Sequence, residues 1–218
     1  MESKDMRIVL IGPPCSGRST QAEMLSKNYG LEKISADDLL REAAKSDERL
    51  GMYLQLTNKR GVLLNHLIVI PDEKVNAVVL PKVKEATRGF VLDGFPSSFG
   101  QAMELDKYAD IAYVIKLKVM TDETFKRLTS RRYCSNSGCG AECNLALVTP
   151  KVPGRCDRCG SGLQRRISDS IELFSQRLDS YEGLENVLDV HYHGVLIEIN
   201  AKKPMDIVYR NICNVMNK

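Results

Sequence analysis

The stretch GPPCSGRST, residues 12–20, decides how the chain is expected to fold. Two glycines five positions apart precede a basic residue and a hydroxyl residue, which is the spacing of a phosphate-binding loop. An apolar, β-branched run (residues 8–12) leads into it, and helical spacing of apolar residues follows over 18–29. In such a loop, glycines let backbone N–H groups and the N-terminus of the next helix face a phosphate. Because strand, loop and helix come in the required order, we favour a phosphate-binding loop over a glycine turn that only starts a helix.

The basic residue of this loop is Arg18, where a loop of this spacing ordinarily carries lysine. A lysine ammonium is a compact point charge, whereas arginine is a wider planar fork that still neutralises phosphate. Because phosphoryl transfer depends on where charges are placed, a displaced cation lowers turnover more than binding. Ser19 or Thr20 offers a hydroxyl to Mg²⁺. The loop predicts nucleotide binding and leaves the rate of turnover open.

Further strand-like runs extend this pattern along the chain, at residues 90–94, 111–117 and 195–199. They are continuously apolar and alternate with helical stretches, which is typical of parallel strands buried on both faces. Ligands on such sheets bind at the carboxyl ends of the strands, where both GPPCSGRST and DGFPSS (93–98) lie. We therefore expect an α/β fold with a parallel sheet flanked by helices.

Composition limits the class of protein. The 218 residues, 43% hydrophobic and 27% charged, suit one sizeable core with small insertions. A net charge of +3, from 31 basic and 28 acidic residues, is too weak to indicate a nucleic-acid or membrane partner. No apolar run approaches 18 residues, and the N-terminus does not read as a signal peptide. An odd number of cysteines, seven, favours a reducing compartment, so we expect a cytoplasmic protein. We also expect a monomer.

Four cysteines form a metal-binding pattern within residues 132–165, a segment rich in Gly, Pro and Cys with few large apolar side chains. C-x₄-C and C-x₂-C, with sixteen residues between the pairs, predict one closed tetrahedral site at Cys134, Cys139, Cys156 and Cys159. We expect structural Zn²⁺ that stabilises this segment, with iron as the alternative and a disulfide pair as a weaker one. Cys143 is a spare, competing ligand. The segment lacks aromatic residues interleaved with its basic ones, which argues against nucleic-acid binding.

Several motifs together carry a family resemblance along almost the whole chain: GPPCSGRSTQ (12–21), ISADDLLRE (34–42), IPDE (70–73), GFVLDGFPSSFGQ (89–101), SRRYC (130–134), CDRCG (156–160) and RRISD to QRL (165–178). The chain resembles the adenylate kinase family, in its long form with a zinc-bearing lid. The resemblance implies reversible phosphoryl transfer from ATP–Mg²⁺ to AMP, giving two ADP. It also implies a core (1–35, 76–131 and 166–218), a monophosphate-binding domain (36–75) and a lid (132–165) that closes over the donor and excludes water.

The resemblance assigns site residues by their place in these motifs. It implies that ATP is bound by Gly12, Pro14, Cys15, Ser16, Gly17, Arg18, Ser19, Thr20, Arg127 and Arg131. It implies that AMP is bound by Ala36, Arg41, Ile70, Gly94, Ser97, Gln101, Arg166 and Arg177, with Gln101 at the adenine edge. The catalytic set implied is Arg18, Arg127, Arg131, Arg166, Arg177 and Asp93, in which Asp93 orders Mg²⁺ and the arginines neutralise phosphate charge. We expect His66, His191 and His193 to be structural or exposed.

The chain departs from the family pattern around both phosphates. Arg18 replaces lysine, Cys15 replaces a loop glycine, and Ser97 stands where an arginine clamps the AMP phosphate. Ala36 and Asp37 replace a threonine–glycine pair, and Ser168 replaces the first of two acids. Losing one arginine–phosphate contact costs roughly 1.5–3 kcal/mol. We therefore expect a kinase with weakened or altered acceptor use. A kinase for another nucleoside monophosphate and a silent nucleotide-binding sensor are the alternatives.

Overall fold

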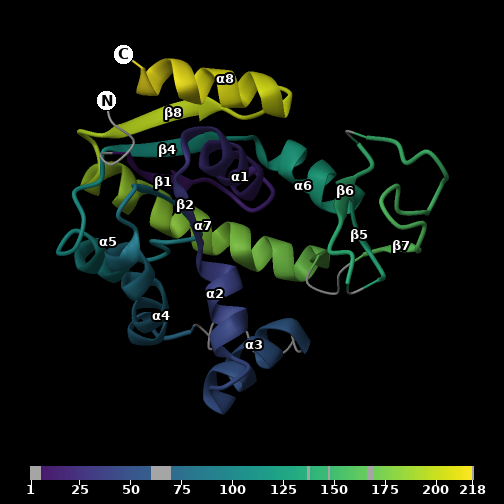
Figure 1. Cartoon of the computed structure of the whole chain (residues 1–218), viewed down its shortest axis with the longest axis horizontal. Helices are drawn as coiled ribbons and strands as arrows, with labels where there is room; N and C mark the ends of the chain where they lie inside the picture. Colours follow the sequence, from purple (N-terminus) through teal and green to yellow (C-terminus); the bar gives the residue numbers. More distant parts are fainter. Residues whose placement is uncertain (1–5, 60–69, 137, 147, 166–168, 218) are drawn as a thin grey trace.

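Helices and strands alternate along most of the chain (Figure 1). The computed structural model describes residues 6–59, 70–136, 138–146, 148–165 and 169–217. Its elements are β1 (Arg7–Ile11), α1 (Arg18–Tyr29), β2 (Glu32–Ser35), α2 (Ala36–Ala43), α3 (Glu48–Lys59), α4 (Asp72–Glu85), β3 (Phe90–Asp93), α5 (Phe99–Leu105), β4 (Tyr113–Lys118), α6 (Thr121–Ser130), β5 (Arg131–Cys134), β6 (Glu142–Asn144), β7 (Leu163–Gln164), α7 (Ile171–His191), β8 (Leu196–Asn200) and α8 (Met205–Met216).

The central sheet has the strand order β2-β3-β1-β4-β8, and every pair of neighbours is parallel. The four runs expected from the sequence are β1, β3, β4 and β8, so the predicted α/β fold is confirmed. The fifth strand, β2, was not predicted because its sequence, EKIS, is polar and only Ile34 is buried. An edge strand covered on one face carries a weaker apolar pattern than a central one.

Alternate side chains of the strands enter two cores, one on each face of the sheet. Ile8 and Leu10 of β1 pack with α1 and α8, whereas Val9 and Ile11 pack with α2, α4, α5 and α7. Figure 1 shows β4 and β8 between α8 above and α7 below. This two-sided burial explains why the strands are continuously apolar. No helix in the described part of the chain combines the length and hydropathy needed to cross a bilayer.

Two segments project from this core. Helices α2 and α3 lie below the sheet in Figure 1, and β5, β6 and β7 form a separate antiparallel sheet beyond α6. The helical character expected for the first segment holds over its described residues, 36–59 and 70–75. The small sheet of the second was not predicted, because its strands are only two to four residues long.

A buried lysine, Lys116, meets three partly exposed carboxylates on the α7 side of the sheet. The Lys116 side chain is 4% exposed, and its Nζ lies 2.7 Å from Glu185 Oε1, 2.5 Å from Asp189 Oδ2 and 3.4 Å from Glu198 Oε1. Burial disfavours the ammonium, but hydrogen bonds from it to Asp189 and Glu185 outweigh burial and raise the pKa of Lys116. The ammonium thereby ties α7 to β4 and β8.

We expect Lys116→Met to lower the free energy of unfolding by about 2 kcal/mol, because three carboxylates lose their shared cation. The loss is smaller than for fully buried pairs, since these carboxylates are 30–44% exposed. Lys118→Met is the matched control: its Nζ pairs with Glu198 at 3.0 Å, but its side chain is 66% exposed. Urea unfolding that gives the two variants equal losses would contradict this role for Lys116.

Candidate active site

The loop after β1 has the backbone that its glycines predict. φ is 153° at Gly12 and 100° at Gly17, values that residues other than glycine rarely adopt. A Cβ at Gly12 would lie 2.8 Å from Ser16 Oγ and 2.9 Å from the carbonyl oxygen of Leu117. Only glycine therefore fits at the first position of the motif, where β1 meets the loop.

A tight turn fills the centre of the loop. The N–H of Ser16 donates to the carbonyl of Pro13 at 3.1 Å, so Pro14 and Cys15 are the two central residues. Cys15 has φ 63°, and proline followed by a positive φ matches a type II turn. A side chain in this conformation costs about 1–2 kcal/mol, a cost that glycine avoids. Cys15 is thus the strained position of the loop.

Asp93, the last residue of β3, joins the loop to the neighbouring strand. Its side chain is buried, and it accepts a hydrogen bond from Ser19 Oγ at 2.5 Å. Arg18 Nε lies 3.7 Å from its other carboxylate oxygen. The parallel register sets Asp93 opposite Leu10 of β1, so the carboxylate emerges at the edge of the sheet where the loop begins. The structure therefore brings Arg18, Ser19 and Asp93 together. Ser19 and Thr20 are both exposed on the first turn of α1.

Arg127 of α6 donates hydrogen bonds to the backbone of the loop. Its Nη1 donates to the carbonyls of Cys15 and Ser16 at 3.4 and 3.2 Å, and its Nη2 donates to the carbonyl of Ala201 at 2.7 Å. Glu123 accepts from its Nε at 3.0 Å. These bonds fix the path of the loop relative to the end of β8. The sequence placed Arg127 on the donor phosphates and did not predict this contact with the loop itself.

Positive charge gathers around Cys15. Burial raises the pKa of the Cys15 thiol, as does the charge of Asp169, while Arg131, Arg177 and Arg127 act in the opposite direction. Three of the predicted arginines, from α6, β5 and α7, thus lie near enough to Cys15 for their charges to act on its thiol. Arg131 Nη2 also pairs with Glu142 Oε2 at 2.6 Å across β5 and β6. Arg166 and Ser168 lie outside the described residues.

The predicted acceptor residues lie at the start of α2 and after β3. Ala36 is buried, and a Cβ at Gly94, where φ is 80°, would lie 3.7 Å from its methyl group. Arg41 is exposed and pairs with two acids of its own helix, Asp38 at 3.2 Å and Asp37 at 3.6 Å. Ile70 is half-buried against the core beside α4. The arginine expected on a monophosphate is thus already shared by two carboxylates.

Gln101 connects the two helices on this side. Its Nε2 donates to Asp72 Oδ1 at 2.7 Å, and its Oε1 accepts from the N–H of Ser97 at 2.7 Å and from Ser97 Oγ at 3.0 Å. Ser98, the N-cap of α5, donates to Asp72 Oδ2. The network joins the start of α4 to the start of α5. The motif IPDE marked Asp72 in the sequence, but no local pattern indicates its bond to a residue 29 positions away.

The four predicted metal ligands are brought together. The Sγ atoms of Cys134, Cys139, Cys156 and Cys159 all lie within 4.8 Å of one another. Cys134 and Cys159 are separated by 3.3 Å, and Cys139 and Cys156 by 3.9 Å. The edge of a tetrahedral Zn–S₄ site is about 3.8 Å, for Zn–S bonds of about 2.3 Å. The described thiols can therefore close on one tetrahedral ion, and Cys143 is not among them.

The thiols of this cluster differ in acidity. Hydrogen bonds from the side chain and backbone of Ser161 lower the pKa of Cys159 to about 6, whereas burial raises that of Cys134 to about 12. Cys159 is also the exposed member. A thiolate is the form that binds metal, and Cys159 is the thiol of the cluster that ionises most readily.

Comparison with known proteins agrees with this geometry. The family model described as adenylate kinase matches residues 10–195. The adenylate kinase of Carboxydothermus hydrogenoformans is 37% identical over 98% of this chain and all of its own length. Those of Ureaplasma parvum and Archaeoglobus fulgidus are 35% and 33% identical, over 98% of this chain and 99% of each relative. The chain belongs to the adenylate kinase family.

Membership of the adenylate kinase family confirms the resemblance expressed by the sequence motifs. It confirms the class as well: a nucleotide-binding phosphotransferase built on a phosphate-binding loop. Two of the residues that depart from the family pattern pair with other predicted site residues, Arg18 with Asp93 and Ser97 with Gln101. Roles for individual residues, and the division into three domains, stay predictions.

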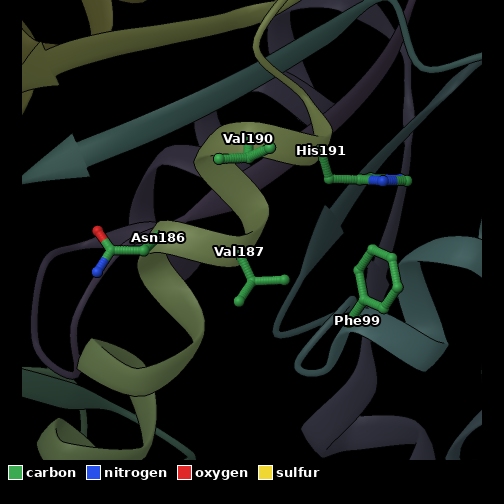
Figure 2. Close-up of a pocket in the computed structure, with 5 residues that line it drawn as sticks. All are labelled: Phe99, Asn186, Val187, Val190 and His191. Carbon is green, nitrogen blue, oxygen red and sulfur yellow. The ribbon is translucent and has the colours of Figure 1, made fainter.

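A surface depression lies between the start of α5 and the end of α7. It has a volume of about 480 Å³ and is lined by Phe99, Asn186, Val187, Val190 and His191. Figure 2 shows His191 above Phe99, with Val187 and Val190 on adjoining turns of α7. His191 pairs with Asp106 at 2.7 Å and His193 is exposed, as expected of structural or exposed histidines. His66 lies outside the described residues.

Proposed function

We propose that the chain catalyses reversible, Mg²⁺-dependent transfer of a phosphoryl group from ATP to a nucleoside monophosphate, with AMP giving two ADP. The observation that carries this proposal is the convergence of Arg18 and Ser19 on the buried carboxylate of Asp93 at the end of the phosphate loop. Family membership supports the same reaction class. We further propose a cytoplasmic monomer whose partners are ATP, AMP and ADP, and the division into core, monophosphate-binding domain and lid described above.

Oxygen ligands suited to Mg²⁺ are available beside the loop. A carboxylate and a hydroxyl, Asp93 and Ser19, are the hard donors that this ion prefers. Mg²⁺ arriving with ATP would neutralise phosphate charge there. The loop amides bind the donor phosphates, and Arg127 keeps the loop in place through the carbonyls of Cys15 and Ser16. Arg131 and Arg177, whose charges act on the thiol of Cys15, would add positive charge around the transferring group.

The acceptor side supports weakened or altered use of AMP. Asp37 and Asp38 compete with a phosphate for Arg41, and Ser97 offers a hydroxyl where the family pattern has a guanidinium. The same pairings, together with Arg18 on Asp93, favour the second candidate, a nucleotide-binding protein with little or no turnover. If the chain is such a protein, Arg41 would stay paired with Asp37 and Asp38 when nucleotides bind, and Arg18 would stay paired with Asp93.

The test is diphosphate formation from AMP, GMP, CMP and UMP with ATP–Mg²⁺, in the parent chain and in Arg18→Lys, Ser97→Arg and the double variant. We expect AMP turnover in the parent below the usual range of about 1–100 s⁻¹. We expect Ser97→Arg to lower the KM for AMP by tenfold or more, since a charged contact is worth about 1.5–3 kcal/mol.

Three results would decide against parts of this proposal. Ordinary turnover of AMP by the parent would remove the claim of weakness. A silent parent whose double variant is active would favour the sensor. If neither the parent nor the double variant is stabilised by a bisubstrate analogue that joins donor and acceptor nucleotides, both candidates fail.

A further inference from the structure

The side-chain amide of Gln101 has an orientation that its neighbours determine. A backbone N–H only donates, so the atom that contacts the N–H of Ser97 at 2.7 Å is the carbonyl oxygen of Gln101. A carboxylate only accepts, so the atom 2.7 Å from Asp72 Oδ1 is the amide nitrogen. Both contacts give the same assignment, and Gln101 is 2% exposed. The neighbours of this buried amide therefore fix the positions of its oxygen and nitrogen.

Most of the hydrogen-bonding capacity of this amide is already used. A carbonyl oxygen has two lone pairs, and Ser97 occupies both, one through its N–H and one through its hydroxyl. Of the two N–H groups on Nε2, Asp72 accepts from one. Asp72 is itself held by Ser98, which donates to its second oxygen. Among the residues that the structure describes, these contacts leave a single N–H donor of the amide for a ligand.

We propose that Ser97 determines base specificity by occupying the carbonyl of Gln101, so that the acceptor base is selected through one hydrogen-bond acceptor on its edge. This inference rests on the proposed function, which places Gln101 at the edge of the acceptor base. A ring nitrogen such as N1 of a purine satisfies the remaining N–H. An exocyclic amino group at the neighbouring position gains no bond, because both lone pairs of Oε1 are filled. The substrate class is nucleoside monophosphates whose base edge has an unprotonated ring nitrogen, such as N1 of adenine, with or without a neighbouring amino group.

Two acceptors distinguish this arrangement from an amide that reads the amino group. AMP and purine riboside 5′-monophosphate share N1 and differ only in the 6-amino group. We expect their kcat/KM values with ATP–Mg²⁺ to agree within about threefold in the parent chain. Ser97→Ala removes the hydroxyl, keeps the backbone N–H and frees one lone pair of Gln101. It is expected to raise the preference for AMP about fivefold, the effect of one neutral hydrogen bond.

Ser98→Ala is the matched control, because Ser98 contacts Asp72 and the N–H of Gln101's backbone but not its carbonyl. We expect the ratio for the two acceptors to stay at the parent value in this variant. A parent that prefers AMP by tenfold or more would overturn the proposal, as would a Ser97→Ala variant with an unchanged ratio.

The experiment also distinguishes failure of this inference from failure of the proposed kinase function. If no variant turns over either monophosphate, the dissociation constants of the same two compounds, measured by calorimetry, replace kcat/KM, and the same ratios are expected. Binding without turnover, with those ratios, would support the role of Ser97 and refute the kinase. Absence of binding by both compounds would refute both inferences.

Discussion

Replacing Cys156 with serine is expected to remove the metal from the cysteine cluster and to lower phosphoryl transfer at least a hundredfold. The reason lies in the small amount of apolar surface that residues 132–165 bury. Among the described residues of this segment, only Cys134, Pro150 and Cys156 are buried, and two of these are predicted ligands. A sheet of three short strands without a hydrophobic core depends on a cross-link for its structure.

The size of this effect follows from the energy of structural zinc. Apparent binding free energies of about 10–16 kcal/mol are found in zinc-finger peptides, where binding and folding are one process. Without one of the four thiolates, most of this binding free energy is expected to be lost, and residues 132–165 are expected to unfold. If this segment is the lid that we propose, its failure to close would admit water to the reacting phosphate and remove Arg131 from the proposed site.

This prediction is tested by measuring the metal content, the absorption spectrum and the turnover of the parent chain and the variant. We expect one equivalent of metal per parent chain, colourless for zinc and coloured for an iron–thiolate site, and none in Cys156→Ser. Cys143→Ser is the control, because Cys143 lies in the same small sheet but outside the described cluster. Its metal content and turnover are expected to match those of the parent. A Cys156→Ser chain that keeps its metal and its turnover would contradict a structural role.

The parts of the fold that the sequence predicts well are those with local causes. Gly12 and Gly17 have backbone angles that glycine alone adopts readily, so the motif predicts the loop geometry directly. Continuous apolar runs predict β1, β3, β4 and β8 because both faces of these strands are buried. The cysteine spacing predicts the cluster because each pair lies on a short turn. In these cases, a few neighbouring residues determine the structure.

The contacts that the sequence does not predict join residues far apart in the chain. Lys116 lies inside a run that reads as a buried strand, and nothing near it indicates its partners on α7 and β8. Arg127 was expected on phosphates, and its bonds to the loop carbonyls depend on how α6 packs. The bond between Ser97 and Gln101 is local, but its meaning appears only once Asp72 is in place. Such pairings are set by tertiary packing rather than by propensity.

Replacing Asp93 with asparagine is expected to lower turnover by about 10²–10³-fold while leaving the fold intact. Asparagine has nearly the same shape and still accepts the hydrogen bond from Ser19, so little stability is lost. It lacks the charge that attracts Mg²⁺ and that holds Arg18 at 3.7 Å. Removing one preorganised electrostatic group from a reacting centre typically costs this much in rate. The Mg²⁺ concentration for half-maximal activity is expected to rise as well.

Asp110→Asn is the control for Asp93→Asn. Asp110 is exposed, and its replacement removes one carboxylate charge, as the replacement of Asp93 does. We expect its turnover and Mg²⁺ dependence to match those of the parent chain. Turnover of Asp93→Asn within threefold of the parent at saturating Mg²⁺ would show that the carboxylate does not act on the ion. An equal rise in Mg²⁺ requirement for both variants would assign the effect to net charge. A loss confined to Asp93→Asn would instead trace it to the position of this carboxylate at the end of β3, beside the loop.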